Sequence, residues 1–550
     1  MSSIKMTSGQ HNTILLDKDG KVWSWGHNQY GQNGNGKKTG MNPNPIPEPV
    51  IPSWGKNVKI TDICAGHNHA AALDENGSVW YWGWDNFAAP PFPGAAVIGG
   101  KAVPERISIC NVYGKEMKIT QIAGGGWNML ALDEEGTLWS WGSNGFGQLG
   151  VKALDIGMGA NSALFAPEPV DVLPEGIKIK SFAAGGQHVA VLDENGEVWT
   201  YGWNQHGQLG NANVKTGLNA YEKIAVKVDG LHGITKVSAS YYHTMAMDEA
   251  GNVYAWGSNQ YGQLGNDAVP SGPDNPAAMS AVPVPVTGLD GAKAADIAAG
   301  YAHSVILDKD GNVWSWGYNL YGQVGVPNVS CGDFLSYMKK PMKLCEWKDE
   351  RGNNKDTKIK SIMCLTNHTM AVDTDDNVWG WGFNRYGQLG NGESDDMNPT
   401  PTLVMWQLGT DISPEPFALA HVTAADESGE LQVEQAGFHA TVYADFGKTS
   451  GMLKDITLKF TDAKENNIFA NIKKDDVRIM EDRYAVAFAS HVHMDFENDG
   501  KTVSLGLKLR DKESYDTPKT VKLRFVNEYN EFGMPVKYDV YYITFAALKQ

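Results

Sequence analysis

ALDEEGTLWSWGSNGFGQLG, residues 131–150, is one copy of a motif that recurs along this chain. The same order of residues returns in LLDKDGKVWSWGHNQYGQNG (15–34), VLDENGEVWTYGWNQHGQLG (191–210) and AVDTDDNVWGWGFNRYGQLG (371–390). Seven copies are marked by aspartates spaced 57, 59, 60, 55, 60 and 65 residues apart: Asp17, Asp74, Asp133, Asp193, Asp248, Asp308 and Asp373. A repeat of this length predicts supersecondary units that bury their apolar faces only against neighbouring copies.

Each copy has the pattern of short antiparallel strands. An alternating run such as KIKSFAAG (178–185) is followed by HVAVLD (188–193), by VWTYG (198–202) and by a proline-bracketed segment. Alternation over short runs, interrupted by turns of the form DxxG, is typical of strands and not of helices. Four strands in each of seven copies predict an all-β fold, a seven-bladed β-propeller over residues 1–410. Closing the ring removes open sheet edges.

The repeated string LD..G.V..WG.N..GQLG resembles the repeats of the family named for the regulator of chromosome condensation (RCC1-like repeats), over about residues 1–410. The resemblance implies a seven-bladed propeller. Members of the family host nucleotide exchange on small GTPases, light sensing and enzyme inhibition, so the fold by itself does not select a function.

Residues that recur in every copy are expected to serve the blade. The glycine after the second aromatic, such as Gly142, is expected to adopt a backbone conformation that a Cβ would block. The paired aromatics are expected to fill the space between blades. A histidine five residues before the aspartate is replaced by Asn12 and Asn128 in two copies, which favours a side chain bonded to backbone over a metal ligand.

The loop just before that histidine varies from copy to copy, so it is available to a partner. If the loop approaches the mouth of the central channel, its aromatic and imidazole side chains form a ring on one face: Trp127, Tyr241, Tyr242, Tyr301, His11 and His67. Aromatic residues with polar tips are enriched at binding surfaces. The alternative is that these side chains fill the channel.

The same loop separates this chain from light sensors. In the ultraviolet-B photoreceptor that shares the fold, a tryptophan recurs two residues before the histidine. Here those positions hold Gln10, His67, Gly126, Gly186, Tyr241, Tyr301 and Thr366. Light sensing is therefore not expected.

The second copy departs from the pattern. After Gly83 it runs WDNFAAPPFPGAAVIGG (84–100), without GQLG, and its aromatics Trp84, Phe87 and Phe92 form either a contact site or a packing surface for the C-terminal region. Other long insertions are expected to emerge on one face, at 151–166, 266–281 and 326–356. The strand within residues 399–408 is expected to close the ring beside residues 4–7.

The last part of the chain lacks the repeat. Residues 411–420 have the character of a linker, and residues 421–550 contain alternating runs such as DITLKFTD (455–462) and TVSLGLKLRD (502–511). About six strands separated by polar turns predict a β-sandwich (Ig-like) domain. This domain is a candidate for assembly with other molecules.

Composition narrows the choice of partner. The net charge is −17 and no run of Lys or Arg forms a patch, so binding to nucleic acid is not expected. No apolar run approaches 18 residues and no basic-then-apolar leader is present, so membrane insertion is not expected. Five cysteines suit reduced thiols. GxSxG, HExxH and CxxC motifs are absent, and neither a metal nor a cofactor is expected.

Three functions follow as hypotheses. The first is a non-enzymatic recognition or structural protein that binds a protein or a glycan through a propeller face, on a microbial surface or a viral assembly. That hypothesis places the chain outside the cell, on a cell surface or on a virion, although the lack of a leader leaves the cytoplasm open. The second is a guanine nucleotide exchange factor for a small GTPase, as the resemblance implies for some members. The third is a polysaccharide-active enzyme, which needs paired carboxylates that the sequence does not locate.

Overall fold

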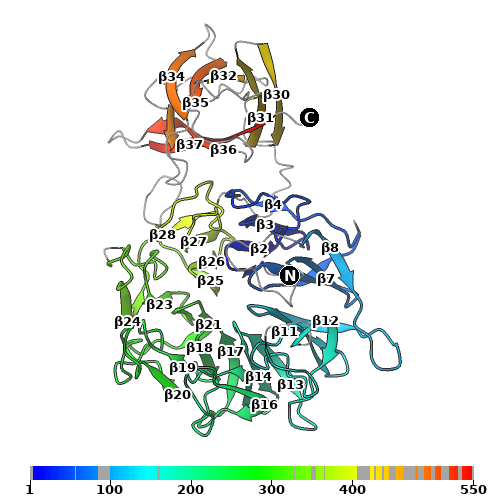
Figure 1. The fold of residues 1–550 in the computed structure, drawn as a ribbon. Coiled ribbons are helices and arrows are strands. Elements are labelled where there is room, and N and C mark those ends of the chain that lie inside the picture. Colours follow the sequence, from blue (N-terminus) through cyan, green and yellow to red (C-terminus); the bar gives the residue numbers. More distant parts are fainter. Residues whose placement is uncertain are drawn as a thin grey trace. The chain divides into compact units, whose positions relative to one another are not determined.

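The computed structural model describes residues 4–55, 57–84, 100–157, 162–327, 329–347, 355–364 and 366–404, together with nine strands between residues 421 and 547. The chain divides into two compact units. The first comprises Met1–Asp349 with Asn354–Gly409, and the second comprises Glu350–Asn353 with Thr410–Gln550. In the first unit, seven four-stranded sheets follow one another around a ring (Figure 1). The seven-bladed propeller predicted from the repeats is therefore confirmed.

Each blade is built from one sequence repeat. Blade 1 contains β1 (Lys5–Ser8), β2 (Asn12–Leu16), β3 (Val22–Gly26) and β4 (Glu48–Pro49). Blade 2 contains β5 (Ile60–Ala65), β6 (His69–Asp74), β7 (Val79–Gly83) and β8 (Lys101–Ile107). Blade 3 contains β9 (Ile119–Gly124), β10 (Asn128–Asp133), β11 (Leu138–Ser143) and β12 (Ala163–Pro169). Blade 4 contains β13 (Ile179–Ala184), β14 (His188–Asp193), β15 (Val198–Trp203) and β16 (Tyr221–Lys227).

The remaining three blades repeat this order. Blade 5 contains β17 (Ile234–Ala239), β18 (His243–Asp248), β19 (Val253–Ser258) and β20 (Met279–Pro285). Blade 6 contains β21 (Ala294–Ala299), β22 (His303–Asp308), β23 (Val313–Tyr318) and β24 (Tyr337–Lys343). Blade 7 contains β25 (Ile359–Cys364), β26 (His368–Asp373), β27 (Val378–Gly382) and β28 (Asn398–Leu403).

Every blade is an antiparallel meander whose strands pair in chain order. The first strand of each blade lies beside the first strands of its neighbours, from β1 through β25 and back to β1, so these strands line the centre of the ring. In a meander, the connection from the first to the second strand and the connection from the third to the fourth strand emerge at the same end. That end of the propeller is named the mouth face.

Two of the three long insertions belong to the mouth face. Residues 151–162 and 266–278 lie in the connections from β11 to β12 and from β19 to β20. The insertion at 326–356 is different, because it contains β24 and continues beyond it. The expectation that all three insertions share one face is therefore wrong for residues 344–347, which follow a fourth strand and leave from the opposite end.

One aspartate in each repeat holds the hairpin between the second and third strands. Asp133 Oδ1 accepts hydrogen bonds from the backbone N–H groups of Glu135 and Thr137 at 2.9 and 2.8 Å. Its Oδ2 accepts one from Trp139 Nε1 at 2.8 Å. Blade 5 has a tyrosine in place of this tryptophan, and there Asn252 Nδ2 donates to Asp248 Oδ2 at 2.7 Å. The DxxG signature is thus a turn, as the sequence indicated.

The second aromatic of the repeat joins neighbouring blades. Trp316 Nε1 in blade 6 donates to the backbone oxygen of Gln263 in blade 5 at 2.9 Å. The same bond to the preceding GQLG-type loop is made by Trp25, Trp82, Trp256 and Trp381. Blade 2 lacks the GQLG signature, and the indole N–H of Trp141 in blade 3 is buried without a hydrogen-bond partner.

The recurring histidine also joins neighbouring blades. His303 Nε2 lies 3.0 Å from Thr369 Oγ1 of the next blade, and the same contact is made by His188, His243 and His368. The hydroxyl group in turn donates to the glutamine carbonyl, as Ser304 Oγ does to Gln263 at 2.8 Å. Burial, with smaller contributions from His243 and His368, lowers the pKa of His303 to about 3, so the ring is neutral. The predicted structural role fits. For these four histidines the partner is a hydroxyl group, whereas Asn12 Nδ2 donates to the backbone oxygen of Gln32 at 3.5 Å, as predicted for this position.

The glycine after the second aromatic allows a close approach inside each blade. Gly142 has a φ of 115°, and a Cβ there would lie 2.4 Å from the backbone oxygen of Trp127. The six equivalent glycines have φ values between 89° and 107°. The glycine is therefore required by both conformation and space, as the sequence predicted.

The ring closes between blades 7 and 1 through side-chain contacts and hydrogen bonds between loops, and not through a shared strand. β28 pairs with β27 at the outer edge of blade 7, whereas β1 pairs with β2 at the inner edge of blade 1. The predicted pairing of these two segments is wrong, because they lie at opposite edges of their blades. Thr13 Oγ1 and Trp25 Nε1 both donate to the backbone oxygen of Gln388 at 2.8 Å. Trp25 also packs with Met370 in a core shared by the two blades.

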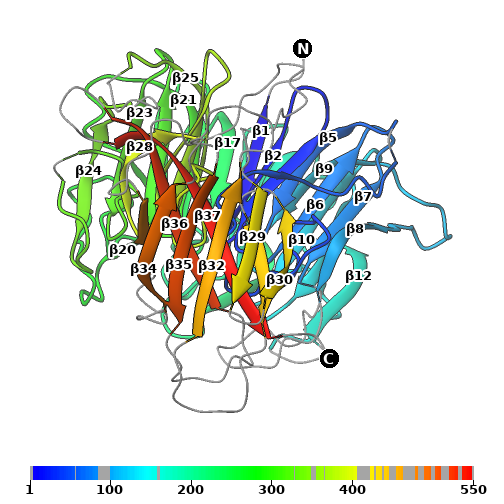
Figure 2. The same ribbon diagram turned by 90° about the horizontal axis from the view of Figure 1, so that it is seen from above.

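The second unit contains one nine-stranded sheet among its described residues, in the order β33-β36-β37-β31-β30-β29-β32-β35-β34. Figure 2 shows β34, β35, β32, β29 and β30 of this sheet side by side. The pairing is antiparallel except between β31 and β37. The strands are β29 (His421–Asp426), β30 (Gly429–Ala436), β31 (His439–Ala444), β32 (Lys454–Thr461), β33 (Val477–Met480), β34 (Ala489–Phe496), β35 (Thr502–Leu509), β36 (Lys519–Tyr529) and β37 (Pro535–Ala547).

These strands do not show two sheets packed face to face, so the β-sandwich stays a prediction. The predicted linker at 411–420 lies outside the described residues. All five cysteines of the chain are free thiols. No helix among the described residues is long and apolar enough to cross a membrane.

Candidate functional site

The loops between the first and second strands are joined from blade to blade at the mouth face. The backbone N–H of Gln10 donates to His67 at 2.8 Å, and that of His67 donates to Gly126 at 3.1 Å. Three more bonds of the same kind follow, each from a backbone N–H to a backbone oxygen: Gly126 to Gly185, Gly186 to Ser240 and Tyr301 to Thr366. Because these bonds link neighbouring blades, they hold the variable loop residues at fixed positions around the channel.

Among the described loop residues, the series lacks a backbone bond between blades 7 and 1, where Thr366 Oγ1 donates to the backbone oxygen of Gln10 instead. It is also interrupted between blades 5 and 6. No backbone hydrogen bond joins the described loop residues there, and the hydroxyl groups of Tyr242 and Tyr301 lie 2.8 Å apart instead. Both side chains are half-buried. The hydroxyl pair replaces a backbone bond that most other blades make.

A cavity of about 350 Å³ opens at this point. It is lined by residues of blades 1, 2, 5, 6 and 7, so it lies at the mouth of the central channel. Five tyrosines make up most of its wall: Tyr241, Tyr242, Tyr301, Tyr318 and Tyr321. The other lining residues are Gln10, His67, Thr366 and Asn367. The variable loops therefore leave a hollow and do not fill the channel completely.

The tyrosine rings pack against one another along this wall. The ring centroids of Tyr241 and Tyr301 are 5.2 Å apart, and those of Tyr242 and Tyr301 are 5.0 Å apart in an edge-on arrangement. Burial raises the pKa of Tyr242, and its contact with the Tyr301 hydroxyl raises it further. Burial also raises the pKa of Tyr241, whose hydroxyl has no hydrogen-bond partner. The phenols of Tyr241 and Tyr242 are therefore uncharged over the physiological pH range.

Two imidazoles predicted for the ring occupy different surroundings. His67 lines the cavity. Its ring centroid lies 4.3 Å from that of Trp127 and 5.8 Å from that of Tyr241. Burial lowers the pKa of His67 to about 3, with smaller contributions from His69 and His27. His11 is absent from the cavity wall and packs against Phe383 and Tyr386 at 5.3 and 5.0 Å.

Two glycines make room for this arrangement. A Cβ on Gly186 would lie 2.6 Å from the ring of Tyr241, and a Cβ on Gly126 would lie 2.5 Å from the backbone oxygen of Gly186. Blades 3 and 4 therefore contribute backbone where blades 5 and 6 contribute phenol rings. Trp127 supports His67 from the side and does not line the cavity.

The second predicted site, in blade 2, is only partly described. Trp84 is buried, with 4% of its surface exposed, and its ring packs edge-on against Tyr30 at 4.8 Å. A partner therefore cannot reach Trp84 as an exposed anchor. Phe87 and Phe92 lie outside the described residues.

Sequence reasoning missed Tyr318, the last residue of β23, and Tyr321, which lies in the connection between β23 and β24. Tyr318 directly follows the Trp-Gly pair of blade 6, and Tyr321 comes three residues later. An aromatic or histidine recurs at the second of these positions, as in Tyr30, Phe146, His206, Tyr261 and Tyr386. These residues form an outer ring around the inner loop residues, with contacts such as His206 to Tyr242 at 5.5 Å. The recurrence of an aromatic or histidine at this position was the sequence signal that could have identified Tyr321 as a candidate.

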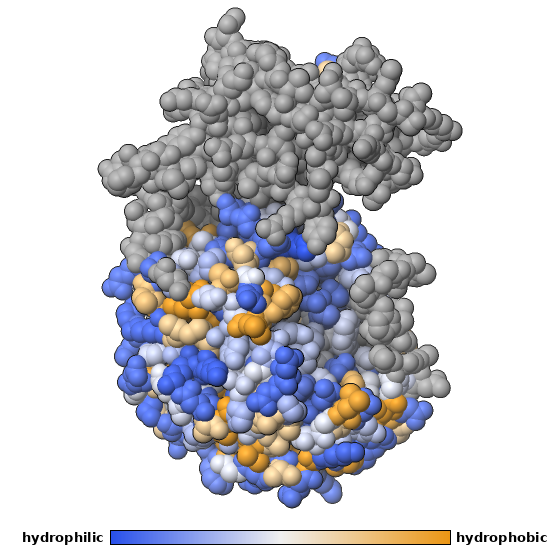
Figure 3. Space-filling model, turned by 60° about the vertical axis from the view of Figure 1, so that its left-hand side comes forward, coloured by the Kyte–Doolittle hydropathy of each residue, from blue (hydrophilic) through white to orange (hydrophobic). Residues whose placement is uncertain are grey.

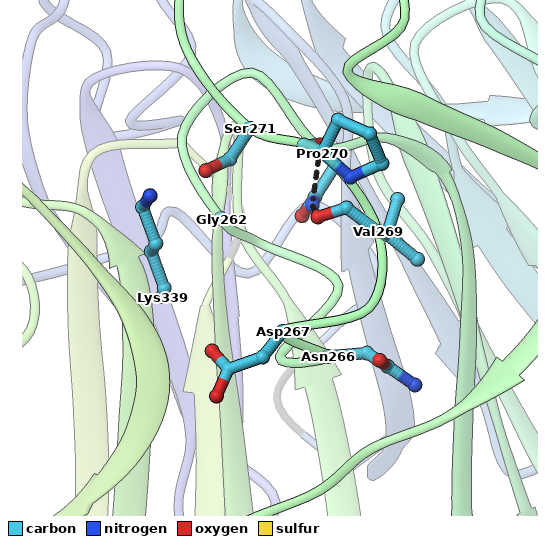
Figure 4. Close-up of a pocket in the computed structure, with 8 residues that line it drawn as sticks. Gly262, Asn266, Asp267, Val269, Pro270, Ser271 and Lys339 are labelled. Carbon is cyan, nitrogen blue, oxygen red and sulfur yellow. Dashed lines mark hydrogen bonds between the residues drawn. The ribbon is translucent and has the colours of Figure 1, made fainter.

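A smaller hollow of about 100 Å³ lies in blade 5, beside Lys339 of blade 6 (Figure 4). It adjoins the loop in which Asn259 Nδ2 donates to the backbone oxygens of Val269 and Pro270, both at 3.0 Å. Asn144, Asn204 and Asn319 donate to the corresponding loops of their own blades at 2.9 Å. This hollow is therefore part of the repeated scaffold.

The surface of the first unit is otherwise mixed in character. Figure 3 shows hydrophobic residues in separate small patches among hydrophilic ones on the face in view. Among the described residues, no group of three or more His, Cys, Asp or Glu side chains could hold a metal ion. The mouth cavity is accordingly the best candidate for a functional site in the described part of the chain.

The sequence matches the model of the RCC1-like domain over residues 1–328 and 153–509. The ultraviolet-B receptor UVR8 of Arabidopsis thaliana is 29% identical over 466 residues, which are 83% of this chain and 94% of that protein. Protein RCC2 of Homo sapiens is 31% identical over 242 residues, 40% of this chain and 43% of that protein.

Among solved structures, Prp20p from Saccharomyces cerevisiae has the same fold. Its TM-score is 0.57 with 23% sequence identity, over 76% of this chain and 89% of Prp20p. That structure was described together with the binding of Prp20p to Gsp1p and histones.

Proposed function

The chain belongs to the RCC1-like domain family, and we propose that it is a regulatory protein that binds a protein partner through the mouth face of its propeller. The observation that carries this proposal is the cavity of about 350 Å³ at the channel mouth, lined by five tyrosines. These tyrosines stand on loops held in place by bonds between blades. Rigid aromatic side chains around a hollow can anchor a partner side chain at low entropic cost.

The hydrogen bonds of the repeated residues and of the cavity residues differ, and this difference supports the assignment. The recurring Asp, Trp, Gln and His residues are occupied by hydrogen bonds within and between blades. Tyr241 and Asn367 have buried polar atoms without a partner, and both line the cavity. Unpaired polar atoms are costly unless a ligand satisfies them. They are therefore the groups that a bound partner would complete.

A second candidate function is guanine nucleotide exchange on a small GTPase. Family membership supports it, and so does the reported binding of Gsp1p and histones by Prp20p. Adhesion, and display on a microbial surface or a virion, draw no support from these relatives and are not part of the proposal. Light reception is not proposed either, because none of the seven loop positions two residues before the His or Asn holds tryptophan.

The proposal is tested by measuring capture of purified Gsp1p and of purified histones by the immobilised full chain. The Tyr242→Ala/Tyr301→Ala variant removes two walls of the cavity. The matched control is Tyr113→Ala, because Tyr113 is 91% exposed in the connection from β8 to β9 at the opposite end of the propeller. We expect the control to bind like the unaltered chain and the mouth variant to bind at least about tenfold more weakly.

Exchange activity is tested separately with a panel of small GTPases preloaded with a labelled guanine nucleotide. Accelerated release with the unaltered chain, and its loss in the mouth variant, would support an exchange factor. Capture without faster release would leave partner binding as the function. Equal capture by the mouth variant and the unaltered chain would contradict the proposed use of this face.

A further inference from the structure

We propose that the mouth cavity accepts an arginine side chain of the partner. The inference rests on the proposed function and names the chemistry that the cavity recognises. It is drawn from the tyrosine walls, from hydrogen-bond acceptors that have no donor, and from the charges around the rim.

The walls have the composition of an aromatic cage. Tyr241, Tyr242 and Tyr301 form a connected group with ring centroids 5.0 to 6.1 Å apart. Tyr318, at the end of β23, and Tyr321, in the connection that follows, complete the wall from blade 6. The face of an aromatic ring attracts a cation, and arginine is the protein cation that most often stacks on such rings. A volume of about 350 Å³ leaves room for a planar guanidinium between the rings.

Three residues that line the cavity also carry buried polar atoms without a hydrogen-bond partner: Tyr241 Oη, Asn367 Oδ1 and His67 Nδ1. A guanidinium carries five N–H donors and no acceptor, so it can serve several such groups at once. Burial lowers the pKa of His67 to about 3, so its imidazole is neutral at physiological pH and does not repel a cation.

The charge around the cavity points the same way. None of the residues that line it is a Lys, Arg, Asp or Glu. At the rim, burial raises the pKa of Tyr321 and the Asp396 carboxylate adds to this effect, while Arg385 opposes it. The Asp274 carboxylate acts on Tyr261 in the same direction, after burial and Tyr301. Arg385 Nε is itself 3.9 Å from Asp396 Oδ1. The net charge of the whole chain is −17. A cationic segment is therefore attracted to the molecule before its side chain enters.

The test uses two acetylated and amidated pentapeptides, Gly-Gly-Arg-Gly-Gly and the same peptide with citrulline in place of arginine. Citrulline keeps the shape and loses the charge. Binding to the full chain is measured by calorimetric titration at low salt. We expect saturable binding of the arginine peptide and at least about tenfold weaker binding of the citrulline peptide.

Variants locate the site. Tyr301→Leu removes a ring and is expected to weaken binding of the arginine peptide at least about tenfold, whereas Tyr301→Phe keeps the ring and should weaken it less than about threefold. Tyr321→Leu is a second ring deletion, made in a different loop in case Tyr301→Leu disturbs folding. Tyr113→Leu is the matched control at the opposite end, and melting curves show that each variant is folded.

Equal affinity for the arginine and citrulline peptides would overturn the inference, and so would binding that survives both leucine variants. If the intact chain captures Gsp1p or histones through the mouth but does not bind the arginine peptide, the inference fails and the proposed function stands. If the arginine peptide binds in the cavity but capture is unaffected by the mouth variant, the proposed function fails instead.

Discussion

Thr244 lies two residues after Tyr242, and Ser304 lies three residues after Tyr301. The hydroxyl groups of the two pairs nevertheless have different roles. The Thr and Ser hydroxyls are buried, and each bridges a histidine of one blade and a glutamine carbonyl. The Tyr hydroxyls bond only to each other, at the wall of the mouth cavity. In this repeat protein, positions that most copies share report how blades are joined, and neighbouring positions that vary between copies report where a partner can bind.

The largest expected effect is a loss of stability at low pH, caused by the histidines that join neighbouring blades. Burial lowers the pKa of His188, His243 and His303 to about 3 and that of His368 to about 4. An unfolded histidine titrates near 6.5, so the unfolded chain takes up protons first as the pH falls. Stability is fully present above pH 6.5 and is lost below it, by about 1.4 kcal/mol per pH unit for each histidine.

Chemical unfolding at pH 7.5 and 5.5 checks this expectation. These four histidines contribute a loss of about 5 kcal/mol, and His67, whose pKa burial also lowers to about 3, adds to it. The matched variant is His303→Asn, which places in blade 6 the residue that blades 1 and 3 carry as Asn12 and Asn128. The stability of this variant should fall less between the two pH values, by the contribution of one histidine, about 1.4 kcal/mol. Stability that does not change between the two pH values would show that these histidines are not held neutral.

The next largest effect is expected inside a blade. Asp308→Ala removes the acceptor of five hydrogen bonds, at 2.8 to 3.1 Å. Two come from the backbone of Asp310 and Asn312, one from Trp314 Nε1 and two from Asn312 Nδ2. We expect a loss of about 3 kcal/mol in the free energy of unfolding. Asp310→Ala, at an exposed position of the same turn, is the control and should cost less than about 0.5 kcal/mol. Similar losses in both variants would mean that the anchoring bonds contribute little.

A smaller effect distinguishes two joints of the ring. Trp316 and Trp141 are both almost completely buried, but only Trp316 has an acceptor for its indole N–H. Trp316→Phe loses a hydrogen bond, whereas Trp141→Phe removes an unpaired donor. Both variants lose similar apolar area, so Trp316→Phe should be the more destabilising by about 1–2 kcal/mol. Equal losses by denaturant titration would refute the assignment of this bond as a joint between blades.

Much of the scaffold could be predicted because its residues recur. Seven copies of the Asp, Gly and Trp-Gly positions specify turns, close approaches and blade number by local chemistry. The loop residues around Tyr241 and Tyr301 could be found by the opposite property, their variation. His11 and Trp127, which were predicted for the ring at the channel mouth, do not line the cavity, because the sequence does not reveal which way a side chain turns from its loop.

Other features depend on contacts between distant segments. Tyr318, at the end of β23, and Tyr321, in the connection after it, reach the cavity because that end of the meander also carries the connections between first and second strands. The sequence around these tyrosines does not contain this relation. The closure of the ring was mispredicted because the proline-bracketed segment near 399–403 marks a strand without indicating which edge of the blade it occupies. The unpaired Trp141 follows from the lost GQLG signature of blade 2, but only after blade contacts are known.

The most direct test compares the unfolding free energies of two double variants that each delete two hydroxyl groups. Thr244→Val/Ser304→Ala removes the hydroxyls that join blades, and Tyr242→Phe/Tyr301→Phe removes those at the cavity wall. Because the first leaves buried histidine and carbonyl groups with fewer partners, we predict a loss of about 3 kcal/mol for it and less than about 1 kcal/mol for the second. An equal or larger loss in the tyrosine variant would show that the mouth residues hold the ring together, and would contradict the separation of scaffold and site.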